Sequence, residues 1–281
     1  MRARLALAKP RITVMVALCA AAGYALATRG DLDWVRLLWT TVGVALASAS
    51  TGCLNQVLEA ELDARMKRTS GRPIPAGLVS AREAWLHGLL WGAAGLGLLA
   101  WKANALSCGL TAFTLASYLL IYTPMKRVSP LSTWIGAVPG ALPPVIGWTA
   151  AGGALDASAA AMFGIQFLWQ MPHFLALAWL YREDYAIGGY RVVSVTDPSG
   201  AALAWQMSAA AALLLAVSAI PFGLGLAGRT YLFTALALGG LFFVLTLAAA
   251  RALTAASARR VFLASLAYLP FVLGALVADR R

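Results

Sequence analysis

The chain has 281 residues, of which 61% are hydrophobic and only 12% are charged. Soluble globular domains carry about twice that charged fraction, so the composition excludes an ordinary soluble protein and predicts an integral membrane protein. The net charge of +11 does not indicate a nucleic-acid partner, because the basic residues are spread over loops between apolar segments, where they suit lipid head groups.

Nine apolar segments are long enough to cross a membrane as helices. All are rich in Ala, Leu and Gly, and such small residues allow helices to approach closely in lipid. A cleaved signal peptide is the competing interpretation of the first segment, but eight similar segments follow it, so we interpret it as a span. The predicted spans are 11–28, 35–56, 84–101, 104–122, 131–151, 157–180, 202–224, 230–250 and 260–278. We expect residues 1–281 to form a single all-α membrane domain with a central cavity.

Four prolines lie within the fifth and sixth predicted spans. Pro139, Pro143 and Pro144 fall in the fifth span, and Pro172 falls in the sixth. A helix that breaks inside a bilayer leaves backbone groups that must face protein or a water-filled cavity. We therefore expect these two spans to line the functional site.

Most of the 22 Lys and Arg residues fall in alternate loops, which lie on one side of the membrane. By the positive-inside rule, the N-terminus and the loops 57–83 and 181–201 are cytoplasmic, and the C-terminus lies outside. The basic residues on the opposite side are Arg29, Arg36, Lys102, Arg229, Arg280 and Arg281. Polar chemistry is thus expected at one membrane face, where both acidic loops lie.

The first acidic loop continues from the second span as NQVLEAELDARMKRTSGRPIPAG. If the helix continues, Asn55, Glu59 and Asp63 lie four residues apart and form one stripe along its face. Hard oxygen ligands of this kind suit Mg²⁺, which proteins hold with a few carboxylates and with substrate phosphates. Basic residues follow and could bind a polyanion. The segment therefore predicts a diphosphate site that faces into a membrane.

Two further groups of polar residues fall on the same side. Arg182, Glu183 and Asp184 form a second cluster, which either carries chemistry opposite the first or is only a solvated loop. Lys126 and Arg127 end the fourth span, where they could anchor the helix or bind phosphate. The sequence leaves both alternatives open for each group.

His173 follows Pro172 in an apolar span, within the stretch WQMPHF. An ionisable residue inside the membrane is a functional candidate by default. It could ligate a haem iron, act as a base or bond a backbone carbonyl freed by the proline. The other histidine, His87, lies in an ordinary span and is interpreted as structural.

Taken together, these motifs resemble the UbiA-type intramembrane prenyltransferases, and within them the protoheme IX farnesyltransferase (haem O synthase) subfamily. The family pattern N-x-x-x-D-x-x-x-D is similar to Asn55, Glu59 and Asp63, with Glu in place of the middle Asp. DARMKRTSGRPIPAG, YTPMKRVSPLSTWIGAVPGALPPVIGW, WQMPHFLALAW and YREDYAIGGY are also similar to stretches of the subfamily. The resemblance is strong over about 52–190.

The resemblance implies an enzyme that transfers a farnesyl group from farnesyl diphosphate to a vinyl group of haem b, with water addition and with Mg²⁺. It implies that Asn55, Glu59 and Asp63 hold one metal, and that Asp184 and Glu183 assist a second. In the second family motif another carboxylate usually follows four residues later, where this chain has Gly188, so Glu183 or Asp197 would substitute. The implied diphosphate ligands are Lys67, Arg68, Arg72, Lys126, Arg127 and Arg182, and the implied catalytic residues are Asn55, Glu59, Asp63, Asp184 and Lys126.

Further expectations concern the acceptor side and the location. We hypothesise that His173 ligates or orients the haem. We also expect a place in a bacterial inner membrane, with membrane lipids and haem-pathway enzymes as further partners. Trp134, Trp148, Phe167 and Trp169 are expected to line the cavity and shield a carbocation, although ordinary packing would also explain them. Two alternatives stay open: an aromatic quinone precursor as the acceptor, and a non-enzymatic haem or lipid transport or assembly protein.

Overall fold

A computed structural model of the protein describes residues 2–28 and 30–281, and Arg29, one of the residues used for orientation, lies outside them. Over the described residues the elements are helical, with one isolated β-bridge between Ala227 and Arg280. The helices are α1 (Arg2–Leu7), α2 (Pro10–Ala27), α3 (Trp34–Leu58), α4 (Ala60–Arg65), α5 (Ala81–Lys102), α6 (Ala105–Ala116), the π-helix η1 (Ser117–Tyr122), α7 (Thr123–Met125), α8 (Ser132–Ala141), α9 (Pro143–Ala150), α10 (Ala157–Leu180), α11 (Arg182–Ile187), α12 (Val193–Thr196), α13 (Ala201–Val217), α14 (Ile220–Gly223), α15 (Arg229–Arg251) and α16 (Ala255–Ala278).

Seven of the nine predicted spans are helical segments that are long and apolar enough to cross a membrane. The fifth predicted span is divided into α8 and α9, and neither piece reaches that length. The sixth corresponds to α10, whose polar side chains Gln166, Gln170 and His173 lower its hydropathy. The all-α membrane fold is confirmed, and the count of nine spans stays a prediction.

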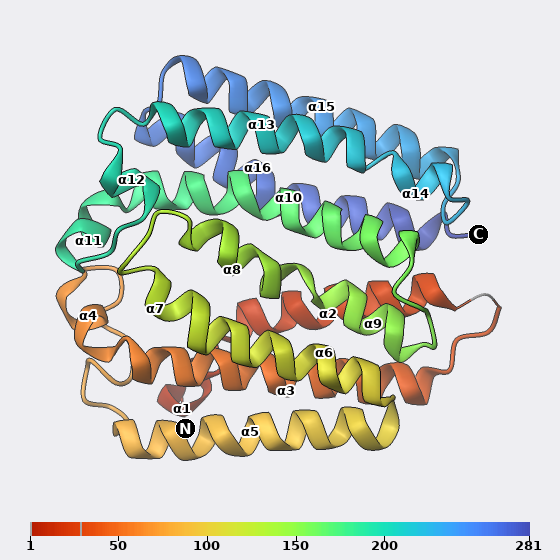
Figure 1. Ribbon diagram of the computed structural model, residues 1–281, viewed down its shortest axis with the longest axis horizontal. Coiled ribbons are helices and arrows are strands. Elements are labelled where there is room, and N and C mark those ends of the chain that lie inside the picture. Colours follow the sequence, from red (N-terminus) through yellow and green to blue (C-terminus); the bar gives the residue numbers. More distant parts are fainter. Residues whose placement is uncertain (1, 29) are drawn as a thin grey trace.

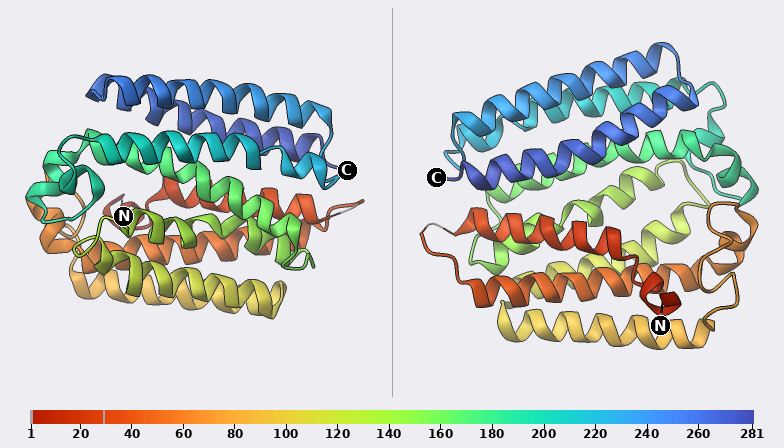
Figure 2. Two further views of the ribbon diagram at one scale, coloured as in Figure 1. Left: turned by 45° about the horizontal axis from the view of Figure 1, so that its top comes forward. Right: turned by 180° about the vertical axis from the view of Figure 1, so that it is seen from behind.

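The long helices lie side by side in a bundle (Figures 1 and 2). α3 packs along α5, α2 along α9, and α10 along both α13 and α16. The short helices α4, α11 and α12 gather at one end of the bundle, and the C-terminus lies at the opposite end (Figure 1). The two acidic loops therefore meet at one end, as predicted, and we refer to it as the motif-bearing end.

Side-chain caps fix where several spans begin. Asp33 accepts a hydrogen bond from Arg36 N at the start of α3, and Ser80 accepts one from Glu83 N at the start of α5. At the start of α16, Thr254 and Ser257 form a reciprocal capping box. Each cap satisfies backbone N–H groups that have no partner within the helix.

Small residues allow α2 and α9 to pack backbone against backbone. A Cβ added at Gly147 would lie 1.8 Å from the carbonyl oxygen of Ala20, and one added at Gly23 would lie 1.8 Å from that of Pro144. No rotamer change relieves a clash with backbone. The expectation that small residues permit close helix approach is confirmed at this pair.

Gly147→Ala is expected to destabilise the protein by about 1–3 kcal/mol, because the two helices must separate to admit the methyl group. The matched control is Gly97→Ala in α5, where an added Cβ meets nothing within 4 Å. Thermal unfolding in detergent compares the two variants. Equal unfolding temperatures for them would contradict this packing argument.

The prolines act differently in the two spans that contain them. The chain breaks at Leu142 between α8 and α9, immediately before Pro143, as expected. In contrast, α8 continues through Pro139 and α10 continues through Pro172, so the helices do not break at these two prolines. Packing of α10 against α13 and α16 holds it helical despite the missing N–H. Both spans line the central cavity, as predicted.

Candidate functional site

The first acidic cluster lies where α3 ends at the motif-bearing end. The helix does not continue without interruption through this segment. α3 ends at Leu58, and Glu59 adopts a non-helical conformation before α4 begins. The four-residue hydrogen-bond spacing survives the bend: Glu59 N donates to Asn55 O at 3.0 Å, and Asp63 N donates to Glu59 O at 2.8 Å. The predicted stripe is therefore retained, and all three residues are buried.

Basic side chains contact each member of this stripe. Arg72 Nη1 donates to Asp63 Oδ2 at 2.5 Å, and the ammonium of Lys126 forms an ion pair with Glu59 Oε1. Asn55 Nδ2 donates to Glu59 Oε2 at 2.9 Å, which joins the amide to the same network. Buried charges of this kind are stable only when they are paired and hydrogen-bonded.

Lys9 is a site residue that the sequence did not single out. Its Nζ donates a hydrogen bond to Asn55 Oδ1 at 2.9 Å. Its backbone has φ 47°, and every other described residue with a positive φ is a glycine. Such strain persists where the surroundings fix it, often at functional sites. Here Gln56 Nε2 donates to Leu7 O at 2.9 Å and ties down the preceding turn.

The charges of the cluster shift one another's pKa values. Burial, together with the nearby charges of Arg72 and Lys126, lowers the pKa of Lys9 to about 7 against the attraction of Glu59 and Asp63. Burial alone would raise the pKa of Glu59, but the charge and hydrogen bond of Lys126, with Lys9 and Asn55, bring it below its usual value. The same pairing raises the pKa of Lys126 against burial. Glu59 and Lys126 are therefore both ionised at neutral pH.

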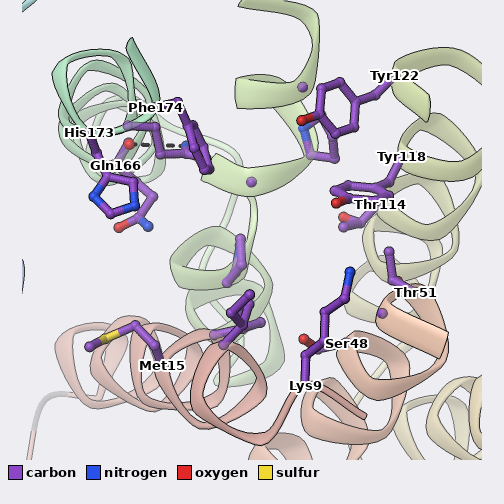
Figure 3. A pocket seen from close by; sticks show the side chains of 18 of the residues that line it. Lys9, Met15, Ser48, Thr51, Thr114, Tyr118, Tyr122, Gln166, His173 and Phe174 are labelled. Atoms are coloured by element: carbon purple, nitrogen blue, oxygen red, sulfur yellow. Dashed lines mark hydrogen bonds between the residues drawn. The ribbon is translucent and has the colours of Figure 1, made fainter. Parts of the chain in front are cut away.

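A largely apolar cavity of about 540 Å³ opens beside these lysines. Lys9 and Lys126 line it, so they lie between the cavity and the acidic stripe. Figure 3 shows Lys9, Tyr118 and Tyr122 on one side of the cavity, with His173 on the other. The π-helix η1 carries both tyrosines, and π-helical turns often occur at functional sites.

The aromatic lining differs from the prediction. Trp169 lines the cavity as expected, whereas Trp134 and Phe167 pack against each other elsewhere, with ring centroids 5.9 Å apart. Trp148 is buried and donates to Ala154 O at 2.8 Å. The expectation is therefore wrong for those three residues. The further aromatic rings in the cavity wall are those of Tyr118, Tyr122, Phe174 and Tyr185.

His173 lies on the cavity wall between aromatic rings. Its ring stacks on Trp169 with centroids 5.1 Å apart, and the Phe262 ring lies 4.9 Å away. Its Nδ1 is 2.7 Å from Ser265 Oγ. The sequence left three roles open for His173, one of which was a hydrogen bond to a backbone carbonyl freed by Pro172. In the structure Nδ1 instead contacts the Ser265 hydroxyl on α16.

The structure does not bring the second acidic cluster to the first. The Asp184 carboxylate accepts hydrogen bonds from Lys67 N and Arg68 N at 3.3 and 3.0 Å, which ties the two acidic loops together. Asp184, Glu183 and Arg182 line a second, exposed pocket, separate from the central cavity. Among the described residues, no group of three or more His, Cys, Asp or Glu side chains is placed to hold a metal.

The remaining basic candidates lie outside the cavity. Lys67 and Arg68 line the exposed pocket with Asp184, and the Arg68 guanidinium lies over the rings of Tyr181 and Tyr185. Arg127 is exposed and contacts the backbone at the end of α3. Asp197 has a structural contact instead: its Oδ2 accepts a hydrogen bond from Ala202 N at 2.7 Å, at the start of α13.

Comparison with known proteins identifies the family. The pattern of the UbiA prenyltransferase family matches residues 16–269, which is most of the chain. The chain belongs to the UbiA prenyltransferase family. It is an integral membrane prenyltransferase, and the non-enzymatic alternative is therefore set aside.

Relatives within the UbiA family match over nearly the whole length of this chain. A protoheme IX farnesyltransferase of Solibacter usitatus is 42% identical, covering 100% of this chain and 99% of the relative. One of Salinibacter ruber is 44% identical, covering 98% and 97%. The mitochondrial protoheme IX farnesyltransferase of Homo sapiens is 39% identical, covering 98% of this chain and 61% of that protein.

Solved structures show that this UbiA-family chain has the family's fold. A digeranylgeranylglyceryl phosphate synthase has a TM-score of 0.82 at 17% identity, covering 99% of this chain and 97% of that one. A UbiA homologue from Archaeoglobus fulgidus, bound to GPP and Mg²⁺, has a TM-score of 0.68 at 15% identity, covering 98% and 99%.

Proposed function

We propose that this enzyme transfers a farnesyl group from farnesyl diphosphate to a vinyl group of haem b, with addition of water, to give haem O. The observation that carries the proposal is the apolar cavity whose lining includes Lys9 and Lys126, with the acidic stripe of Asn55, Glu59 and Asp63 behind them. The full-length similarity to proteins named protoheme IX farnesyltransferase supports haem b as the acceptor.

The residues of the stripe fit a divalent cation. Asp63 is 1% exposed, and its Oδ1 has no hydrogen-bond partner among residues 2–28 and 30–281. A buried carboxylate oxygen in that state is costly unless a ligand satisfies it. With the oxygens of Asn55 and Glu59 it forms the hard donor set that Mg²⁺ prefers. When bound, Mg²⁺ would stabilise the charge that develops on the departing diphosphate.

The chain's own residues would bind and shield the reacting groups. Lys9 and Lys126 would hold the diphosphate oxygens at the mouth of the cavity, and Arg72 would neutralise Asp63 and the leaving group together. The rings of Tyr118 and Tyr122 line the adjacent wall, where they would stabilise the allylic cation and exclude water. Lys67, Arg68, Arg127 and Arg182 would attract the substrate from outside.

Glu183 and Asp184 are proposed to assist only if the acidic loops rearrange on binding, since Asp184 bonds backbone groups in this structure. We also propose that the motif-bearing end faces the cytoplasm of a bacterial inner membrane, because most basic residues lie in loops at that end. His173 would border the haem within the cavity.

The lowered pKa of Lys9 predicts a pH effect on substrate capture. Only the protonated ammonium attracts diphosphate, so kcat/KM for farnesyl diphosphate should fall as pH rises through about 7, the pKa of Lys9 in the free enzyme. Lys9→Arg keeps its charge at every accessible pH and should move this fall to higher pH. An unchanged pH profile in Lys9→Arg would show that another group causes it.

The product tests the proposed function. Purified enzyme with haem b, farnesyl diphosphate and Mg²⁺ should give a porphyrin whose mass has increased by one farnesyl group and one hydroxyl group. Formation of a prenylated aromatic quinone precursor, with no change in haem, would support the alternative acceptor and overturn haem O synthesis.

A further inference from the structure

Three polar side chains project from one face of α10 into the cavity. Gln166, Gln170 and His173 are spaced four and three residues apart, so they share a face of the helix. Polar groups within a span are costly unless they are bonded or functional. Their hydrogen bonds therefore indicate which of them is available to a ligand.

The hydrogen bonds of Ser265 fix which nitrogen of His173 carries a proton. Ser265 Oγ lies 2.6 Å from Phe262 O, and a carbonyl oxygen has no proton to place between the two atoms. The single hydroxyl proton must therefore point at Phe262 O. His173 Nδ1, 2.7 Å from the same Oγ, must then be the donor. The neutral imidazole consequently keeps its lone pair on Nε2.

The surroundings also hold the ring in place. Trp169 Nε1 donates to Ser265 O at 2.8 Å, so the residue that stacks on His173 is bonded to the residue that orients it. Phe262 packs on the ring and belongs to the same turn of α16. The imidazole is thus fixed by α10 and α16 together before any ligand arrives.

Gln166 provides an amide two helical turns before His173 on the same face of α10. The residue is 6% exposed, and its hydrogen bond is a long contact of 3.9 Å from Cys19 Sγ to Oε1. Its Nε2 has no partner among the described residues, and the side chain lines the cavity. Figure 3 shows Gln166 and His173 on the same side of the cavity, across from Lys9. An unpaired buried amide of this kind is suited to a polar ligand.

We propose that His173 is the base that activates the water added during the reaction, that Gln166 binds water on the same wall of the cavity, and that Ser265 is a positioning residue for His173. The proposal rests on the proposed function. Farnesyl transfer breaks the C–O bond to diphosphate, which leaves with the electron pair. The vinyl π electrons form the new C–C bond and leave a cation on the carbon next to the porphyrin. Water forms a C–O bond to that carbon, and its proton passes to His173 Nε2.

This role accounts for the placement of polar groups away from the diphosphate end. In an apolar cavity, a cation that meets no water loses the neighbouring proton instead and becomes an alkene. A base with its lone pair fixed toward an oriented water favours hydroxylation over that loss. The ratio of hydroxylated to alkene product therefore reports on His173 directly.

The test measures this product ratio by mass spectrometry, because the alkene product is lighter than haem O by one water. His173→Gln and Gln166→Leu should each lower the ratio by at least about tenfold, which is a small part of the usual effect of a general base. Ser265→Ala should lower the ratio as well. Ser265→Thr keeps the hydroxyl, so its ratio should equal that of the wild type. The ratio is recorded only on enzyme that turns over, so partial unfolding does not alter it.

Ser208→Ala in α13 is the matched control, since Ser208 does not line the cavity, and its product ratio should equal that of the wild type. An unchanged ratio in His173→Gln, whether or not the absorption spectrum of bound haem changes, would overturn the inference. Absence of any prenylated haem from the wild-type enzyme would instead overturn the proposed function, so the two failures are distinguishable.

Discussion

Asp63→Asn should lower the rate of farnesyl transfer by about 10²- to 10³-fold, the usual cost of losing one preorganised charge at a reacting centre. The substitution keeps the shape of the side chain and removes its charge. It weakens the contact with Arg72 Nη1 at 2.5 Å and removes the charge from Oδ1, a buried oxygen with no hydrogen-bond partner among the described residues. The measurement is the initial rate of hydroxyfarnesyl product formation at saturating Mg²⁺.

Glu61→Gln is the matched control for this variant. Glu61 belongs to the same short helix, α4, and is exposed, whereas Asp63 is buried. The two substitutions change the net charge equally, so a general electrostatic effect would lower both rates alike. A rate for Asp63→Asn that equals that of Glu61→Gln would contradict the role assigned to Asp63.

Lys126→Met should have a comparable effect on activity together with a large effect on stability. The ion pair joins two buried side chains, since that of Lys126 is 11% exposed and that of Glu59 is 4% exposed. Removing one partner of such a pair leaves an uncompensated charge and costs about 3–5 kcal/mol. Lys9 remains near Glu59, so we expect the lower end of this range.

The double variant Lys126→Met, Glu59→Gln separates stability from function. Neutralising Glu59 removes the buried unpaired charge, so the unfolding temperature should return toward that of the wild type. Activity should stay low, because the Lys126 ammonium that would hold the diphosphate and the Glu59 carboxylate that would bind the cation are both lost. Recovery of both activity and stability in the double variant would show that Lys126 has only a structural role.

The sequence predicts the positions of the helices well because apolar runs of this length have few alternatives in a membrane. It also predicts that the loops 57–83 and 181–201 lie at the same end, since both follow an even number of crossings. The acidic stripe is recognised from its four-residue spacing, and this spacing survives the bend at Glu59. Features that follow from periodicity and topology are therefore accessible without a structure.

The aromatic lining is not accessible in that way. A soluble helix shows which side is buried through its apolar stripe, whereas a membrane helix is apolar toward both lipid and protein. The rotation of α8 and α10 about their axes therefore cannot be read from composition. This is why Trp134 and Phe167 were expected in the cavity but pack outside it, while Tyr118 and Tyr122 line it.

Lys9 escapes prediction for a different reason. A lysine before the first span looks like an ordinary positive-inside anchor. Its entry into the site depends on a left-handed backbone conformation, φ 47° and ψ 62°, and on the room that Gly52 leaves for its stem. The signal in the sequence was only the dipeptide Lys9-Pro10, where a proline starts the helix and the preceding residue is kept out of it.

In the proposed mechanism, the stripe of Asn55, Glu59 and Asp63 holds a divalent cation beside the bound diphosphate. The most direct measurement is anomalous scattering from crystals grown with Mn²⁺ and a non-reactive analogue of farnesyl diphosphate. We predict a manganese peak between the oxygens of these three residues, with the farnesyl chain in the cavity that Tyr118 and Tyr122 line. A peak only beside Glu183 and Asp184 in the exposed pocket would contradict this account.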